Sequence, residues 1–221
     1  MTTSPPLSSY EPTSRRPIAG MFRRTAQGAV QVAVRAGIHP DVFSYGSIAA
    51  AAVAAFLFWQ SRTHPKYLIV AVLFAFLRLW LNMFDGMVAL AAGKGSKRGE
   101  IVNDLPDRAS DVLIFAGVAH SGWCNGFIAY WVAIAAVIVA YVGLFGQAVG
   151  VQREFSGIMA KPWRIVALSV GALITCWLVH ANRPFWYGGY SVLDWTHFAI
   201  LAGCVQTVYV RLSRIVRALP S

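Results

Sequence analysis

The chain has 221 residues, of which 57% are hydrophobic and only 13% are charged. A soluble domain usually has about 25% charged residues, so the composition excludes an ordinary soluble domain and indicates a membrane protein. The net charge is +10, but no nucleic-acid-binding motif accompanies it, so we expect no nucleic acid partner. Three scattered cysteines share no metal-ligand spacing and are expected to be packing residues.

Residues 1–20 are rich in Pro, Ser and Thr and have no apolar core, which predicts a disordered N-terminal tail. Residues 21–40 alternate apolar with basic or small residues at helical spacing. This pattern predicts an amphipathic helix on the cytoplasmic leaflet, with its arginines toward anionic lipid. The alternative is an ordinary solvated helix.

Residues 41–221 are predicted to form a six-helix transmembrane domain. A hydrocarbon core of about 30 Å needs about 20 helical residues, and six apolar runs come close to that length or exceed it. They cover residues 42–60, 66–91, 105–122, 127–149, 164–181 and 194–212. The expected fold class is therefore an all-α integral membrane protein, with six transmembrane helices preceded by an amphipathic helix.

Six spans place alternate connections on opposite sides of the membrane. The two termini, the second connection and the fourth connection together carry 15 of the 19 basic residues. The positive-inside rule then puts both termini in the cytoplasm. This also leaves room for an anionic substrate on the same face.

Acidic residues gather at the cytoplasmic end of the second and third spans: Asp85, Glu100, Asp104, Asp107 and Asp111. Asn82, Asp85, Gly86 and Ala89 are spaced i, i+3, i+4 and i+7, so they share one helix face. Asn103, Asp107 and Asp111 share a face of the next helix in the same way. Glu100 and Asp104 also fit a simpler role as helix-end groups.

The second and third spans are expected to be antiparallel neighbours, so their acidic faces can converge on one site. Uncompensated carboxylates at close range repel one another, and a bound divalent cation relieves that repulsion. Hard oxygen ligands favour Mg²⁺, Mn²⁺ or Ca²⁺ over zinc. Acids inside spans are rare and usually functional, so a metal site is predicted here.

The order of these residues resembles a family motif. The chain reads Asn82-x-x-Asp85-Gly86-x-x-Ala89-Leu90, eight further residues, and Gly99-x-x-x-Asn103-x-x-x-Asp107. It is similar to the Asp-x-x-Asp-Gly-x-x-Ala-Arg and Gly-x-x-x-Asp-x-x-x-Asp pattern of the CDP-alcohol phosphotransferases. Asn82, Leu90 and Asn103 depart from the family identities.

The resemblance implies a phosphatidyltransferase of phospholipid synthesis that uses a CDP-linked lipid donor, which is expected to be CDP-diacylglycerol. A small alcohol or phospho-alcohol would accept the phosphatidyl group, with release of CMP. The family is further expected to use Mg²⁺ or Mn²⁺ in a two-metal site, to work among membrane lipids and to form homodimers. The implied location is a bacterial-type inner membrane, with the active site cytoplasmic.

Two registers of the motif compete. The gapless register makes Asn103 the third position and Asp107 the base toward the acceptor hydroxyl. The alternative makes Asp107 a metal ligand and Asp111 the base. Pro106 favours the alternative, because proline fits a helix only in its first turn, which would start the third helix near Asn103 as the N-cap. The predicted metal ligands are then Asp85, Asp107 and Asp111, with Asn82 and Asn103 as neutral oxygen donors.

Further residues are expected to bind the nucleotide or lipid. Gly86, Ala89 and Gly99 would let the nucleotide approach the helices, beside Asn82 and Asp85. Lys94 or Arg108 would replace the arginine missing at Leu90. The candidates for an anionic acceptor head or lipid phosphate are Arg153, Lys161 and Arg164.

Two other functions fit the pattern less well. The departures at Asn82, Leu90 and Asn103 also suit a catalytically weakened relative that acts as a lipid- or nucleotide-binding scaffold. A small transporter would use its acids as a cation pathway, but such acids would be dispersed across the depth of the membrane. Here they gather at one face.

Overall fold

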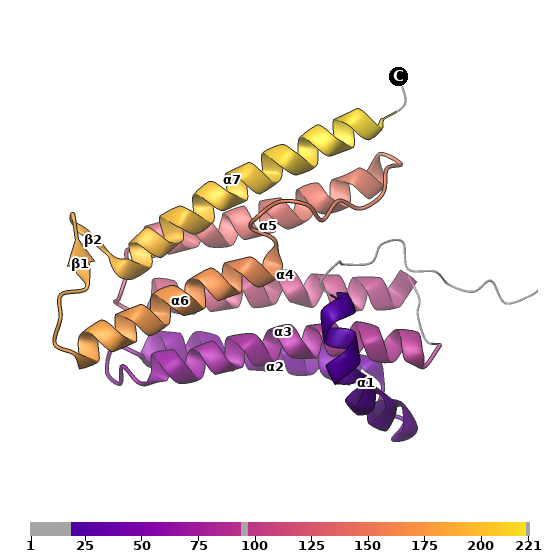
Figure 1. Ribbon diagram of the computed structural model, residues 1–221, viewed down its shortest axis with the longest axis horizontal. Helices are drawn as coiled ribbons and strands as arrows, with labels where there is room; N and C mark the ends of the chain where they lie inside the picture. Colours follow the sequence, from indigo (N-terminus) through magenta and orange to yellow (C-terminus); the bar gives the residue numbers. More distant parts are fainter. Residues whose placement is uncertain (1–18, 94–96, 220–221) are drawn as a thin grey trace, which may run out of the picture.

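The computed structural model describes residues 19–93 and 97–219, with side chains described from residue 27 onward except at 97–103 (Figure 1). Residues 1–18 of the predicted tail, and Lys94, lie outside the described residues. The elements in chain order are α1 (Ala19–Arg35), α2 (Pro40–Gln60), α3 (Tyr67–Ala91), α4 (Lys97–Ala119), α5 (Gly126–Ala148), α6 (Lys161–His180), β1 (Trp186–Tyr187), β2 (Tyr190–Ser191) and α7 (Val192–Ala218).

The six predicted spans correspond to α2 to α7, which confirms the all-α membrane fold class. Within the described residues, α2, α3, α5, α6 and α7 are long and apolar enough to cross a membrane. The helix α4 falls short of that composition because its first half carries the charged residues that the sequence places together. The least apolar of the long helices is therefore the one that brings acids into the bundle.

The start of α4 differs from the sequence prediction. The helix begins at Lys97, so Asn103 lies inside it and is not an N-cap, and Pro106 is its tenth residue. A proline inside a helix removes one backbone hydrogen bond and costs about 3 kcal/mol. Packing of α4 against α2 and α5 offsets that cost. The sequence prediction is based on local helix propensity, which takes no account of tertiary packing.

The helix α1 crosses one end of the bundle at an angle and packs against α3 (Figure 1). This is the end that the sequence predicts to face the cytoplasm. Val30 and Ala33 are buried beside Val88 of α3, and Phe43, Phe84 and Met87 pack around them. Part of the apolar face of α1 is therefore used against the protein. Its predicted contact with the lipid surface stays a prediction.

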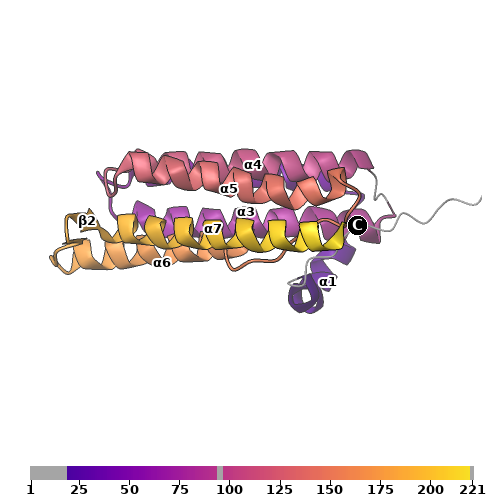
Figure 2. The ribbon, with the colours of Figure 1, turned by 90° about the horizontal axis from the view of Figure 1, so that it is seen from above.

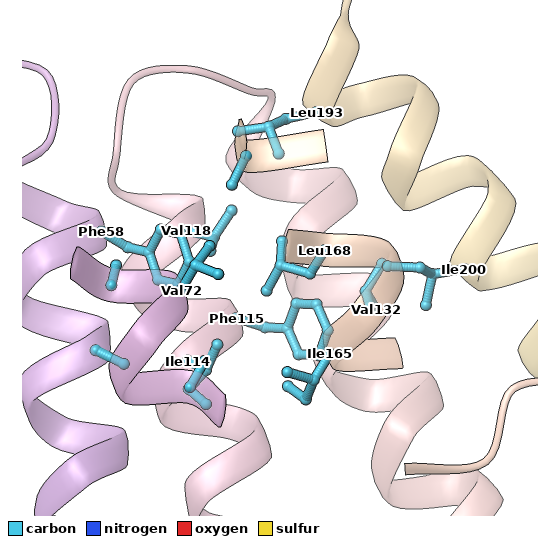
Figure 3. Packing of buried hydrophobic residues seen from close by; sticks show 14 of the residues in the cluster. Phe58, Val72, Ile114, Phe115, Val118, Val132, Ile165, Leu168, Leu193 and Ile200 are labelled. Atoms are coloured by element: carbon cyan, nitrogen blue, oxygen red, sulfur yellow. The ribbon is translucent and has the colours of Figure 1, made fainter. Parts of the chain in front are cut away.

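The long helices run roughly along one axis around a continuous apolar core (Figures 1 and 2). Side chains from all six meet there, including Phe58, Val72, Phe115, Val132, Leu168 and Ile200 (Figure 3). The helix α4 packs mainly against α2 and α5, rather than against its chain neighbour α3. The predicted pairing of the second and third spans is thus a minor contact, and α6 bridges to α3 instead.

The two ends of the bundle are different. One end holds α1, the end of α3, the start of α4 and the C-terminal end of α7, and the other holds the β1–β2 hairpin (Figure 1). The hairpin turns through Gly188 and Gly189, whose φ angles of 59° and 81° suit glycine. The helix α6 begins partway along the bundle, so the residues at its start lie beside the middle of its neighbours (Figure 1).

Candidate active site

The buried face of α3 changes from apolar to polar along its length. Leu68, Ala71, Val72 and Ala75 begin this face, and Arg78, Asn82 and Asp85 continue it at the same helical spacing. Helical periodicity is the reason that the polar residues enter the interior: they occupy positions of the stripe that faces the other helices.

The helix α4 shows the reverse order. Its buried face starts with Asp107, Ser110 and Asp111 and continues with Ile114, Phe115 and Val118. Because α3 and α4 run in opposite directions, the polar end of each stripe lies toward the same end of the bundle. The aspartates of the two helices therefore meet in one buried polar region, as the sequence predicted.

Arg78 and Arg164 enclose Asp111. Nη2 of Arg78, from α3, donates to Oδ1 of Asp111 at 2.9 Å, and Nη2 of Arg164, from α6, donates to Oδ2 at 2.8 Å. Arg78 also donates to the backbone oxygen of Asp107 at 2.8 Å. Both oxygens of the Asp111 carboxylate are therefore bonded to arginine.

Lys161 ties three helices together at the start of α6. Its ammonium group donates to Oδ1 of Asn82 on α3 and to Oδ1 of Asp107 on α4. Only 7% of Lys161 is exposed, and Asp107 is fully buried. The Asp107 carboxylate also has the Arg78 guanidinium 3.4 Å away.

Asp85 has a hydrogen-bond partner on α2. The Ser44 hydroxyl donates to Oδ2 of Asp85 at 2.7 Å, and the backbone N–H of Gly86 lies against Oδ1. A Cβ built on Gly86 would meet no atom of the described residues within 4 Å, apart from its chain neighbours and the backbone of its own helix. The helix surface beside Asp85 is therefore open, as expected for a residue that lets a ligand approach.

These contacts define what we call the buried ion cluster: Arg78, Asp85, Asp107, Asp111, Lys161 and Arg164. A second group of charges lies outward from it. Asp104, 16% exposed at its side chain, pairs with Arg108 at 2.7 Å and with Arg153 at 2.6 Å. Arg153 thus lies one layer outside the cluster, on the connection between α5 and α6.

That connection is held against the bundle by further polar contacts. Arg211 of α7 donates to the backbone oxygens of Ser156 at 2.9 Å and Val139 at 2.6 Å. Burial acts to raise the pKa of Glu154, but hydrogen bonds from Ser156 and the charge of Arg214 outweigh it, so this pKa lies below its ordinary value. Glu154 stays ionised, and the segment before Lys161 has fixed partners.

The structure brings together six of the residues singled out from the sequence: Asn82, Asp85, Asp107, Asp111, Lys161 and Arg164. Ala89 is half-buried, further along α3. Lys94 lies outside the described residues, as do the surroundings of Gly99 and the side chain of Asn103. Sequence reasoning missed Ser44, although a serine within an apolar span was the available signal. It also did not identify the partner of Arg78.

The oxygen atoms of the cluster include donors of the kind that bind a divalent metal. Asp85, Asp107 and Asn82 offer carboxylate and amide oxygens, which suit Mg²⁺ or Mn²⁺. The oxygens of Asp111 are both bonded to arginines, so they are less available to a metal. By its chemistry the set fits one hard cation centred on Asp85.

A different group of potential metal ligands lies toward the other end of the bundle, among the described residues. Cys124, Asp194 and His197 place one ligand atom each within 4.8 Å of the others. Asp194, however, closes the capping box of α7 by accepting from the backbone and hydroxyl of Ser191 at 2.9 Å. Its oxygens already have a structural function.

Comparison with known proteins gives a consistent result. The model of the CDP-alcohol phosphatidyltransferase family matches residues 37–209. A phosphatidylinositol phosphate synthase of Mycolicibacterium smegmatis is 26% identical, over 88% of this chain and 83% of its own length. An archaetidylinositol phosphate synthase of Pyrococcus horikoshii is 23% identical, over 95% of this chain and 98% of its own length.

Solved structures agree with the fold. Phosphatidylinositol phosphate synthase of Mycobacterium tuberculosis with CDP-DAG bound superposes with a TM-score of 0.69 and 20% identity, covering 87% of this chain and 94% of that one. The same enzyme in complex with manganese and citrate also gives a TM-score of 0.69, covering 86% of this chain and 88% of that one. The arrangement of helices is therefore shared.

Proposed function

Because the chain belongs to the CDP-alcohol phosphatidyltransferase family, we propose that it transfers a phosphatidyl group from CDP-diacylglycerol to a small alcohol and releases CMP. The observation that carries the proposal is the buried ion cluster. Two helices present Asn82, Asp85 and Asp107 to a third helix that begins with Lys161 and Arg164. Such a site can hold a cation and a diphosphate together.

The family match confirms the resemblance predicted from the sequence, together with the membrane fold and the phosphatidyltransferase class. The predicted divalent metal and CDP-linked donor agree with a solved relative whose structures hold manganese and CDP-DAG. The predicted site residues and their roles stay proposals.

Each part of the site is assigned a task in this proposal. Asp85 and Asn82 would hold the divalent cation, which would neutralise the diphosphate and the charge that develops on the departing CMP. Gly86 leaves room for the nucleotide beside them. Arg153 and Arg108, at the outer rim, supply positive charge for an anionic acceptor.

The reaction forms one bond and breaks one. The acceptor oxygen bonds to the phosphorus that carries the diacylglycerol, and the bond from that phosphorus to the oxygen of CMP breaks. The acceptor hydroxyl gives its proton to a carboxylate. We assign this proton to Asp107, the base of the gapless register. Asp111 is assigned to hold Arg78 and Arg164, because both of its carboxylate oxygens are bonded to these arginines.

The acceptor proposed first is an inositol phosphate. Two of the relatives are named as synthases of inositol phosphate lipids. An anionic phospho-alcohol also suits the basic rim described above. Glycerol phosphate and serine are the alternatives to include in any assay.

The chain is an integral membrane protein. We propose a bacterial-type inner membrane, with both termini and the active site on the cytoplasmic side. The support is the distribution of basic residues, 15 of 19 of which fall on the termini, the second connection and the fourth connection.

The test is CMP release by the purified protein, with CDP-diacylglycerol, Mg²⁺ or Mn²⁺ and the acceptor panel. We expect CMP only in the presence of one acceptor. Asp107→Asn should lower the rate by about 100-fold or more, because the proton acceptor is lost. The matched control is Asp41→Asn, an acid at the start of α2 and outside the cluster, which should keep the rate. An Asp107→Asn rate close to wild type would exclude Asp107 as the base.

One observation favours a second function. Asp107 and Asp111 have cationic partners within the protein, so the fold does not require a metal to balance them. A catalytically weakened family member that binds lipid or nucleotide would have this arrangement. Binding of CDP-diacylglycerol without CMP release, for every acceptor in the panel, would support this function over the first.

A further inference from the structure

The buried ion cluster is balanced in charge. Among the described residues it combines three carboxylates, Asp85, Asp107 and Asp111, with three cations, Arg78, Lys161 and Arg164, and each of the six is at most 7% exposed. Buried charges are costly unless they are paired. The protein itself supplies that pairing.

Of the three positively charged residues, Lys161 has the position that most resembles that of a bound metal ion. Arg78 and Arg164 each donate to the Asp111 carboxylate and to a backbone oxygen. The ammonium of Lys161, in contrast, is shared between side-chain oxygens of two different helices, Oδ1 of Asn82 and Oδ1 of Asp107. A small cation held by oxygens from α3 and α4 would occupy the same position.

We propose that the Lys161 ammonium is a built-in cation of this site and competes with divalent metal for the oxygens of Asn82 and Asp107. The chain then takes one divalent cation, centred on Asp85, instead of two. Lys161 is a positioning residue in this arrangement, because it holds the α3 and α4 side chains at a fixed separation from the start of α6.

The charge balance has a consequence for binding order. A divalent cation alone would add two positive charges to a buried cluster that is already neutral among its described members. A diphosphate diester brings two negative charges, so the metal and the nucleotide are best accommodated together. Metal alone should therefore bind weakly to the wild-type protein. The identity of the diphosphate rests on the proposed function, but the competition between Lys161 and metal does not.

The experiment measures Mn²⁺ binding to the purified protein in detergent, without nucleotide, from the electron paramagnetic resonance signal of free Mn²⁺. Lys161→Met removes the ammonium and should tighten Mn²⁺ binding by about tenfold or more, because a neighbouring positive charge is lost. The matched control is Lys66→Met, the same change at an exposed residue just before α3, and it should leave Mn²⁺ binding unchanged.

Two further variants keep the test decisive. Lys161→Gln repeats the loss of charge with a polar side chain, and is used if Lys161→Met does not elute as a single folded species. Lys161→Arg keeps the charge and should bind Mn²⁺ as weakly as wild type. The proposal is overturned if neither neutral variant binds Mn²⁺ more tightly, or if Lys161→Arg gains affinity as they do.

The outcome is separate from that of the CMP assay. Tighter Mn²⁺ binding in Lys161→Met, together with no CMP release by the wild type, would uphold the role of Lys161 and reject the phosphatidyltransferase proposal. CMP release by the wild type, together with unchanged Mn²⁺ binding in the neutral variants, would uphold the phosphatidyltransferase proposal and reject the role of Lys161.

Discussion

At the scale of single residues, Gly86 shows how a small side chain serves a site. It follows Asp85 on α3, and among the described residues outside its own helical turn none lies within 4 Å of the place where its Cβ would be. Alanine stabilises a helix by about 1 kcal/mol relative to glycine, so stability alone does not favour glycine here. The open space is better explained by a ligand that passes close to the backbone.

Gly86→Ala should therefore separate stability from activity. We expect an unchanged or raised unfolding temperature, together with a KM for CDP-diacylglycerol raised about tenfold, since one methyl group in a fitted pocket is worth about 1–3 kcal/mol. Gly28→Ala, in α1, is the control, because a Cβ at Gly28 would also meet none of the described residues within 4 Å. An unchanged KM in Gly86→Ala would show that the nucleotide does not contact this part of α3.

Two residues of the same type in one motif can have different surroundings in the structure. Asp107 and Asp111 look equivalent in the sequence, one helical turn apart. In the structure Asp111 is bonded to two arginines, whereas Asp107 is bonded to Lys161 beside Asn82. Their different surroundings arise from Arg78 of α3 and from Lys161 and Arg164 of α6, which lie 29 to 54 positions away in the chain.

At the scale of elements, the contact between α2 and α4 is set by a glycine. A Cβ on Gly117 would overlap the backbone of Ala55, so the two helices approach as closely as they do only with glycine at this position. This contact positions α4, and hence Asp107 and Asp111, relative to Ser44 on α2.

Gly117→Ala should push α2 and α4 apart and destabilise the protein by about 1–3 kcal/mol, as overpacking does in other cores. Thermal unfolding in detergent, followed by circular dichroism, measures this effect. Gly46→Ala is the matched control in α2, because its Cβ would lie at an ordinary 3.6 Å from Leu81. Equal unfolding temperatures for the two variants would contradict the proposed close contact.

At the scale of the whole molecule, the two ends of the helix bundle differ both in the elements that they hold and in their predicted positive charge. The end of α3, the start of α4 and the C-terminal end of α7 lie together, and the β1–β2 hairpin lies opposite (Figure 1). Of the 19 basic residues in the sequence, 15 fall on the two termini, the second connection and the fourth connection. The positive-inside rule then predicts that the first of these ends faces the cytoplasm.

Reporter fusions check that orientation in a bacterial host. A phosphatase that folds only in an oxidising compartment should be inactive when fused after Ser221 and active when inserted between Gly188 and Gly189. The outcome follows from the basic residues at the first end, which resist translocation. Activity in the opposite pattern would place the buried ion cluster near the outer face of the membrane.

The sequence by itself determined the six long helices, the family, and the acidic faces of α3 and α4. These features depend on apolar run length and on a period of 3.6 residues, which are local properties of the chain. The start of α4 was mispredicted, because packing against α2 and α5 keeps Pro106 inside the helix. Only the tertiary structure decided which cations meet the acids. Arg78, Lys161 and Arg164 reach Asp107 and Asp111 across 29 to 54 positions of sequence, and such pairing depends on how whole helices pack, which no local pattern encodes.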